Sequence, residues 1–225
     1  VRSSAASDVY KRQQGLELVD FVSKYKLEFA DGTVYSPDED GLFLSQSDKD
    51  DNESGTQFDD VLYGNGGDDS LHGKDGDDIL SGGKGNDNLD GGNGRDVYIW
   101  NKGDGFDTIV DYGENIIRFG EGIAFDDLTF AYENGYLLIT VDGDDTQGVK
   151  IRDFFGSQKE QYMVEKLEFA DGSSFNLAES GLTLTQKNTA EQVEGTDFDD
   201  VIYGNGGSDT IHANDCLLYT SPSPR

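Results

Sequence analysis

Five aspartates recur at every ninth residue within 55–99. They hold position six of five consecutive units, which read GTQFDDVLY, GNGGDDSLH, GKDGDDILS, GGKGNDNLD and GGNGRDVYI. The aspartates are Asp60, Asp69, Asp78, Asp87 and Asp96. Regularly spaced carboxylates beside a glycine-rich backbone offer oxygen ligands, which suit a hard cation such as Ca²⁺. The spacing therefore predicts a row of calcium sites.

Glycines and large apolar residues keep the register of these aspartates. Position one is Gly in every unit, position four is Gly in all but the first, which has Phe58, and position eight is Leu or Tyr98. Glycine at positions one and four predicts a positive φ and a tight turn. The residues after the turn predict a short strand whose middle side chain points inward.

Stacked turns are expected because one turn is too small to bury its own apolar residue. If two units make one turn of a flattened right-handed coil, each aspartate lies above that of the unit two further on. The expected pairs are Asp60 with Asp78, Asp78 with Asp96, and Asp69 with Asp87. They give three sites. Asp107 extends the array, because 103–109 repeats the motif two residues out of phase.

The unbroken run of GGxGxDxUx units resembles the RTX, or haemolysin-type calcium-binding, repeat. The resemblance implies a right-handed parallel β-roll that binds Ca²⁺. It also implies export by a type I secretion system to the outside of the cell or to its surface. A disordered linker rich in Gly and Asp is the alternative, but a linker needs no apolar residue at every ninth position.

The chain also repeats itself at a longer interval. LEFADG occurs at 27–32 and again at 167–172, an offset of 140 residues. At this offset Gly55 maps to Gly195, and the second set of aspartates is Asp200 and Asp209. We therefore expect about one and a half periods of a larger tandem array.

These repeats set the expected domain boundaries. We expect the end of a β-rich module at 14–54, a β-roll at 55–102, a β-rich capping module at 103–185 and the start of a second roll at 186–215. Strands are expected at 115–119, 128–132, 136–142, 149–155 and 162–169, with a hairpin turn at Asn134-Gly135. Residues 103–177 resemble the β-rich module that follows such repeats in haemolysin-type proteins. Such a module would cover the open end of the roll.

Both ends of the chain look foreign to the fold. A short oligonucleotide that encodes 8–13 has a reverse complement that, read one base along, encodes 216–220. That oligonucleotide resembles a transposon end used to prepare sequencing libraries. We therefore interpret 1–13 and 216–225 as adapter-derived artefacts. A genuine basic N-terminal arm is the alternative for the first segment.

The charge excludes several classes of partner. The chain carries 17 basic and 46 acidic residues, a net charge of −29. Without the two end segments the counts are 13 and 45, a net charge of −32. Self-repulsion of this size opposes compaction and disfavours binding to nucleic acid or to an anionic membrane. Bound divalent cations would neutralise it. Apart from Cys216 the chain has no cysteine, and no run is long enough for a transmembrane helix.

No combination of residues predicts catalysis. His72 and His212 occupy the same repeat position, whose side chain should face outward. The acidic pairs that end at position six recur in successive units, so metal binding or solvation explains them better than a glycosidase site. We expect no enzymatic activity in this segment, and the metal ligands are the only functional residues predicted.

The expected function is a calcium-binding stalk of a large secreted or surface protein of adhesin type, which folds when it meets calcium outside the cell. The alternative is a calcium-binding secretion or folding module of a toxin or secreted enzyme whose active domain lies elsewhere. More periods of 140 residues upstream would favour the stalk, whereas a catalytic motif there would favour the enzyme.

Overall fold

The computed structural model describes residues 27–28, 34–35, 41–111, 113–152, 154, 162–177, 179–185, 192–195, 199–203, 210–212 and 218–220. Within these ranges the chain is all-β, apart from one 3₁₀ turn, η1 (Phe125–Asp127). No helix in the described ranges is long and apolar enough to cross a membrane.

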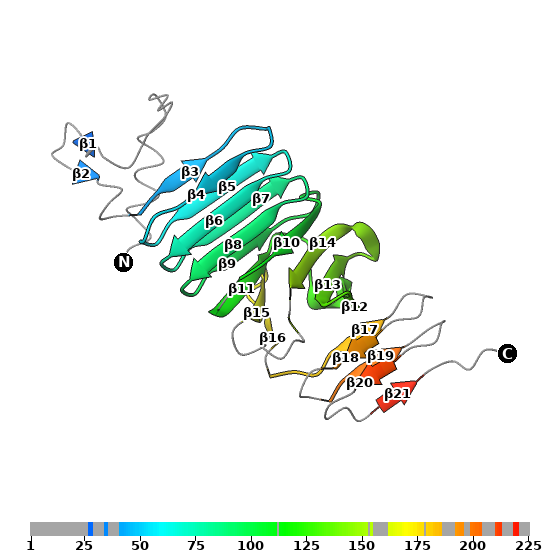
Figure 1. The fold of residues 1–225 in the computed structure, drawn as a ribbon. Helices are drawn as coiled ribbons and strands as arrows, with labels where there is room; N and C mark the ends of the chain where they lie inside the picture. The colour runs from blue at the N-terminus through cyan, green and yellow to red at the C-terminus, as the bar shows by residue number, and fades with distance from the viewer. Residues whose placement is uncertain are drawn as a thin grey trace.

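Successive strands of the repeat region alternate between two sheets (Figure 1). One sheet contains β3 (Phe43–Ser45), β5 (Val61–Gly66), β7 (Ile79–Lys84) and β9 (Val97–Trp100). The other contains β4 (Asn52–Ser54), β6 (Ser70–Asp75), β8 (Asn88–Asn93) and β10 (Phe106–Ile109). Neighbouring strands within each set are parallel. The predicted parallel β-roll is therefore confirmed.

The register shows that two units make one turn. Val61 pairs with Ile79 and Ser70 pairs with Asn88, so equivalent positions stack at every second unit. The position-eight side chains lie between the sheets and form the core of the roll: Leu62, Leu71, Leu80, Leu89 and Tyr98 are at most 2 % exposed. Apolar burial between the sheets therefore stabilises the stack of turns, in addition to the backbone ladders.

The glycines do not act as predicted at position one. Positive φ occurs at position four, for example at Gly67 (109°) and Gly76 (119°), and at position two, for example at Asn65 (73°) and Lys74 (90°). None of the position-one glycines has a positive φ. These glycines are needed because a side chain there would strike the position-six aspartate, as described below. The space needed by the aspartate side chain, and not the backbone conformation, explains why position one is glycine.

The parallel ladder extends beyond the predicted units in both directions. Upstream, β3 and β4 already pair in register with β5 and β6. Downstream, β11 (Gly113–Phe119) pairs with β9, and β15 (Tyr162–Phe169) pairs with β11. In the other sheet, β14 (Asp144–Arg152) pairs with β10. The module that follows the repeats therefore continues both sheets of the roll.

Within the module the chain changes from parallel coiling to hairpins. β12 (Leu128–Glu133), β13 (Tyr136–Val141) and β14 are antiparallel neighbours, and Asn134 and Gly135 form the predicted turn with φ of 52° and 89°. β15 and β16 (Ser174–Asn176) form a second hairpin. The five strands predicted here are present, but β14 begins at Asp144 and ends at Arg152, where 149–155 was predicted. β1 (Leu27–Glu28) and β2 (Val34–Tyr35) make the same kind of hairpin around the first LEFADG.

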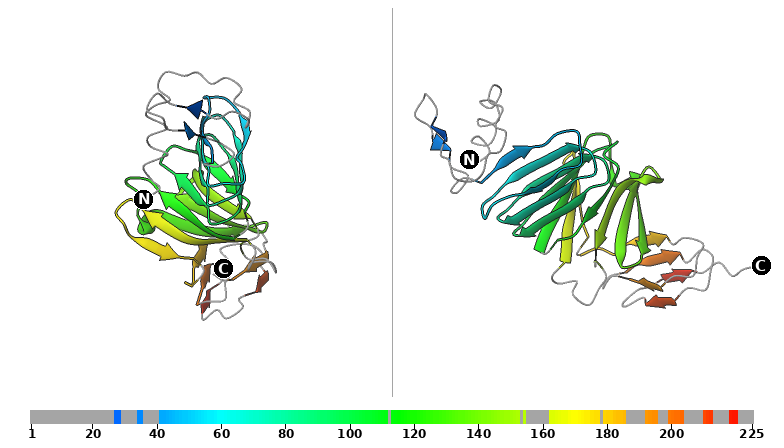
Figure 2. Two further views of the ribbon diagram at one scale, coloured as in Figure 1. Left: turned by 90° about the vertical axis from the view of Figure 1, so that its left-hand side faces the viewer. Right: turned by 45° about the horizontal axis from the view of Figure 1, so that its top comes forward.

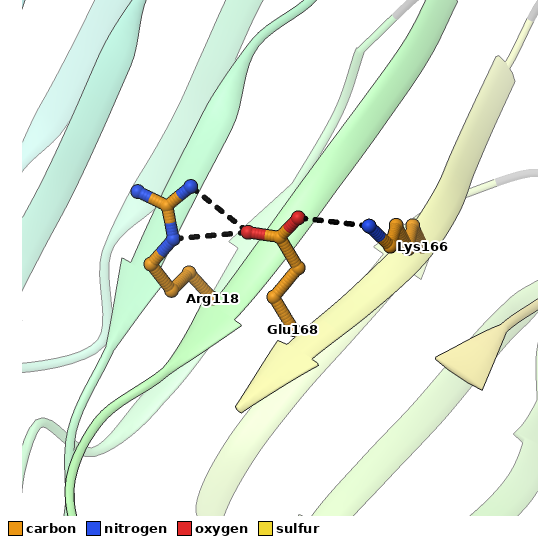
Figure 3. A network of polar contacts seen from close by, with 3 residues as sticks. All are labelled: Arg118, Lys166 and Glu168. Atoms are coloured by element: carbon orange, nitrogen blue, oxygen red, sulfur yellow. Dashed lines mark hydrogen bonds and ion pairs between the residues drawn. The ribbon is translucent and has the colours of Figure 1, made fainter. Parts of the chain in front are cut away.

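Aromatic side chains and ion pairs hold the module together. Trp100, Phe119 and Phe169 pack in sequence, with ring centroids 6.0 Å and 5.7 Å apart. Arg118 of β11 donates to Oε2 of Glu168 on β15 at 2.9 Å, and Lys166, also on β15, donates to Oε1 of the same carboxylate at 3.0 Å (Figure 3). These bonds, first from Lys166 and then from Arg118, lower the pKa of Glu168. Ordinary packing and ion pairs therefore take over where the aspartate columns end.

The second repeat block joins the sheet that contains β10 and β14. β17 (Thr183–Thr185) pairs in parallel with β12 through Phe130 and Leu184, and β19 (Val201–Tyr203) and β21 (Leu218–Thr220) follow. β18 (Gln192–Glu194) pairs in parallel with β20 (Thr210–His212). Figure 2 shows the roll, the module strands and the second block following one another through the molecule. β21 lies within the segment interpreted as adapter-derived and pairs with β19 as an edge strand.

Candidate metal centre

The position-six aspartates form two buried columns, one at each edge of the roll. In the first column, the N–H of Asp60 donates to Oδ1 of Asp78 at 2.6 Å, and the N–H of Asp78 donates to Oδ1 of Asp96 at 2.7 Å. In the second, the N–H of Asp69 donates to Oδ1 of Asp87 at 2.7 Å, and that of Asp87 to Oδ1 of Asp107 at 3.0 Å. Each aspartate therefore spans two turns, and Asp107 extends the second column.

The second oxygen of four of these carboxylates has no partner. Oδ2 is buried without a hydrogen bond in Asp69, Asp78, Asp87 and Asp96. A buried unpaired carboxylate oxygen costs free energy unless a donor or a cation reaches it. The regular recurrence of the same unsatisfied atom indicates an intended ligand at each of these positions.

Backbone carbonyls approach the same points. A methyl group built on Gly64 would overlap Oδ2 of Asp69 and lie 2.5 Å from the carbonyl oxygen of Gly82. A methyl group on Gly73 would likewise overlap Oδ2 of Asp78 and lie 2.6 Å from the carbonyl oxygen of Gly91. The spaces kept open by Gly64 and Gly73 are thus each faced by one carboxylate oxygen and by a carbonyl from the next turn, and those at Gly82 and Gly91 are faced by Oδ2 of Asp87 and of Asp96.

Burial raises the pKa of these carboxyl groups when no cation is present. The pKa of Asp78 rises to about 7 and that of Asp87 to about 6, chiefly through desolvation, with the charges of neighbouring aspartates adding to it. Desolvation likewise raises the pKa of Asp96 and of Asp107 to about 8. The metal-free sites therefore disfavour the very charges that a divalent cation would stabilise.

These features fit Ca²⁺. The described residues hold no cluster of three or more His, Cys, Asp and Glu side chains that could bind a metal by themselves. The ligand set must therefore combine carboxylates with backbone carbonyls, which is the mixed oxygen set that calcium accepts. Bound calcium would supply the positive charge that these buried oxygens lack.

The first aspartate of the first column has a different environment. Oδ2 of Asp60 accepts a bond from the N–H of Thr56, and the Thr56 hydroxyl donates to the same carboxylate at 3.1 Å. Nζ of Lys74 donates to the carbonyl oxygen of Gly55 at 2.6 Å. Burial raises the pKa of Asp60, and the bonds from Thr56 and the charge of Lys74 oppose this rise. The chain itself therefore supplies hydrogen-bond donors to the first gap of the column, where a gap is the space between two successive column residues, here Asp60 and Asp78.

The remaining predicted residues lie as follows. Asp200 is buried and its Oδ1 accepts from the N–H of Leu182 at 2.6 Å, just as Oδ1 of Asp60 accepts from the N–H of Leu42 in the first block. Asp209 lies outside the described residues. His72 faces outward, as predicted, and its Nδ1 lies 3.0 Å from Oδ2 of Asp90 on the next strand of the same sheet.

Sequence reasoning missed two members of the columns. Asp51 precedes the first recognised unit, and its N–H donates to Oδ1 of Asp69 at 2.8 Å. Asn115 continues the first column, accepting from the N–H of Asp96 at 2.8 Å. Counting in nines would have found Asp51, at nine residues before Asp60. It would not have found Asn115, because Asn115 lies 19 residues after Asp96, whereas the earlier members of this column are 18 residues apart.

Position five carries a second, exposed ladder. Here the later turn donates to the earlier one: the N–H of Asp77 to Oδ1 of Asp59 at 3.1 Å, and the N–H of Arg95 to Oδ1 of Asp77 at 3.0 Å. The same bond joins Asn86 to Asp68 at 2.9 Å. The paired aspartates of the first three units thus have separate roles, position six inside and position five outside.

Comparison with known families agrees with this geometry. A model of the RTX calcium-binding nonapeptide repeat matches residues 47–80, 63–98 and 188–215. In these segments the chain is similar to RTX calcium-binding repeats. A model of the haemolysin-type calcium binding protein related domain matches residues 137–179, within the module that follows the RTX repeats. The first match begins ahead of Gly55, where the structure also has the upstream turn.

Two individual proteins resemble parts of the chain. The iron-regulated protein FrpA of Neisseria meningitidis serogroup C is 34 % identical over 121 residues, which are 51 % of this chain and 10 % of that protein. The chain therefore spans about a tenth of this relative's length. The solution structure of the AlgE6R3 subunit of the Azotobacter vinelandii mannuronan C5-epimerase matches with 25 % identity and a TM-score of 0.40, over 58 % of this chain and 83 % of that one.

Proposed function

We propose that this chain is a calcium-folded stalk segment of a large secreted or surface-attached RTX-type protein of adhesin type. The observation that carries the proposal is the recurrence of a buried carboxylate oxygen without a partner in Asp69, Asp78, Asp87 and Asp96. Each such oxygen faces a space kept open by glycine. Calcium there would convert a repulsive column into one that joins successive turns.

The columns explain why folding would depend on the environment. Without a cation, buried carboxylates in adjacent turns repel one another, and glycine-rich turns lose much entropy on ordering. Extracellular calcium modules bind at about 10⁻⁴ to 10⁻³ M, so millimolar calcium outside a cell would fill the sites. The binding free energy then becomes folding free energy. A chain unfolded in low calcium would also pass a type I secretion channel more readily.

Continuity of the sheet supports the stalk over the alternative. β17 of the second block pairs with β12 of the module, and the module is itself paired with the roll through β14 and β10. One sheet thus connects both repeat blocks. A spacer under tension benefits from such continuity, whereas a terminal module of a toxin or enzyme has no need of a second block beyond its cap.

Far-ultraviolet circular dichroism of the whole chain tests the proposal. In chelator we expect a largely disordered spectrum, and a cooperative gain of β signal as calcium rises to millimolar levels. Magnesium should be much less effective, because it requires a tighter octahedral site. A complete β spectrum in chelator would contradict the calcium-dependent folding.

Limited proteolysis then tests the stalk. If the two blocks form one continuous stack, the segment between β16 and β19 should resist cleavage in calcium as well as the roll does. Rapid cleavage there, with the roll intact, would favour the alternative of a separate terminal module.

A further inference from the structure

The last gap of the first aspartate column differs in composition from the others. Asp60, Asp78 and Asp96 are followed by Asn115, whose Oδ1 accepts the N–H of Asp96 at 2.8 Å. Asn115 preserves the hydrogen bond of the column but carries no charge. A cation in the gap beyond Asp96 would therefore have one column carboxylate, where the gaps before it have two.

A carboxylate from outside the repeat pattern reaches this gap. Asp111 is 6 % exposed, and its Oδ1 accepts the N–H of Gly92 at 2.9 Å. Its Oδ2 accepts the hydroxyl of Tyr98, and that hydroxyl in turn accepts the N–H of Gly91 at 2.7 Å. Tyr98 stands where the other four units have Leu. Three departures from the repeat, at Tyr98, Asp111 and Asn115, therefore meet at one place.

The carboxyl groups of Asp96 and Asp111 both approach Gly91: a methyl group built there would overlap Oδ2 of Asp96, and the N–H of Gly91 donates to the Tyr98 hydroxyl that bonds Asp111. Oδ2 of Asp96 is buried and has no hydrogen-bond partner. After burial itself, the charge of Asp111 is the main cause that raises the pKa of Asp96, and a side-chain contact with Asp111 adds to it. Two buried carboxylates repel at this range unless a proton or a cation lies between them.

We propose that Asp96 and Asp111 together bind a calcium ion at the C-terminal end of this column, with Asp111 replacing the carboxylate that Asn115 lacks. This site rests on the proposed calcium-binding function. An ionised carboxylate offers about four acceptor positions, so Asp111 can hold an ion together with its bonds to Gly92 and Tyr98. Tyr98 is a positioning residue, since its hydroxyl orients Asp111 and does not itself need to contact the ion.

Calorimetric calcium titration of the whole chain tests the site by comparing two variants that remove the same charge. Asp111→Asn should lower the stoichiometry by about one ion per chain. Asp145→Asn, at an exposed position of the module, should leave it unchanged. Tyr98→Phe should retain the stoichiometry and weaken binding of one ion by about tenfold. Circular dichroism at saturating calcium verifies that each variant is folded.

The outcomes separate this inference from the proposed function. If the unaltered chain binds calcium and Asp111→Asn binds the same number of ions, the proposed site is wrong and a proton serves the Asp96–Asp111 pair. If the unaltered chain binds no calcium, the proposed function fails first. If Asp111→Asn does not fold, a crystal structure of the calcium-loaded unaltered chain decides. An ion within about 2.3–2.6 Å of oxygens of both Asp96 and Asp111 is required, and its absence overturns the proposal.

Discussion

Asp60 and Asp78 are joined by a hydrogen bond of 2.6 Å from the N–H of the first to Oδ1 of the second, across one full turn of the roll. The bond leaves Oδ2 of Asp78 buried and unpaired. Asp78 also donates its own N–H to Asp96. It is therefore the aspartate through which three turns of one edge are connected.

Replacing this residue should have opposite effects with and without calcium. Asp78→Asn keeps Oδ1 but removes a buried charge, so we expect the metal-free fold to become more stable and the calcium-loaded fold less stable. Calcium stoichiometry should fall more than in Asp60→Asn, because Asp78 borders two gaps. Circular dichroism in chelator, where the unaltered chain is expected to be largely disordered, measures the first effect as a gain of β signal, and urea unfolding in calcium measures the second. Asp77→Asn, at the exposed neighbour, is the matched control, and equal behaviour of the two variants would count against the column.

The need for free space at position one, beside the aspartate, can be tested by a glycine-to-alanine substitution, which adds a single methyl group. Gly64→Ala should destabilise the calcium-loaded protein by about 1–3 kcal/mol, because the new methyl would overlap Oδ2 of Asp69. Gly66→Ala meets its nearest atoms at 3.7 Å and should have a much smaller effect. Thermal unfolding in saturating calcium compares them. Similar losses would mean that backbone freedom, and not access to the site, explains the glycines.

Lys74 should compete with calcium at the first gap. Its ammonium donates to the carbonyl oxygen of Gly55 and lies near Asp60. Lys74→Gln removes the charge while leaving the same backbone strain at φ 90°, so calcium affinity at this end should rise. Isothermal titration measures it, with Lys84→Gln as a control on an exposed residue of the next strand. Unchanged or weaker binding would show that Lys74 does not occupy the gap.

The metal-free fold should be more stable in mild acid. The pKa values of Asp78, Asp96 and Asp107 lie near 7 to 8 when folded and near about 3.9 when unfolded. The folded state therefore binds more protons between these values, and its free energy of unfolding falls as pH rises from about 4 to about 8. Circular dichroism in chelator at about pH 5 and about pH 8 checks the sign, because the β signal should be larger at the lower pH. In saturating calcium the trend should reverse, because protons then compete with the ion.

Much of the roll follows from the sequence because its repeat is strict. The period of nine predicts the two-unit turn, the inward Leu residues and the aspartate columns, since each depends only on position within the unit. The hairpin at Asn134-Gly135 is also predictable, because few residues other than Asn and Gly tolerate its positive φ.

Other features could not be predicted because they depend on distant partners. The sequence pattern alone does not distinguish a glycine that turns the backbone from one that makes room for an aspartate, so the prediction for position one was wrong. Asp111 and Asn115 lie outside the regular spacing, and their relation to Asp96 appears only when the turns are stacked. Nothing in the composition of the module indicates that its strands continue both sheets of the roll.

The two ladders of aspartates give the stack unlike ends. At position six the earlier turn donates to the later one, whereas at position five the later turn donates to the earlier. A turn exposed at the C-terminal end therefore presents an inner donor and an outer acceptor, and a turn at the N-terminal end presents the reverse. The two ends are complementary, because each donor of one end matches an acceptor of the other. A C-terminal end can therefore form both sets of hydrogen bonds with an N-terminal end, and two ends of the same kind cannot.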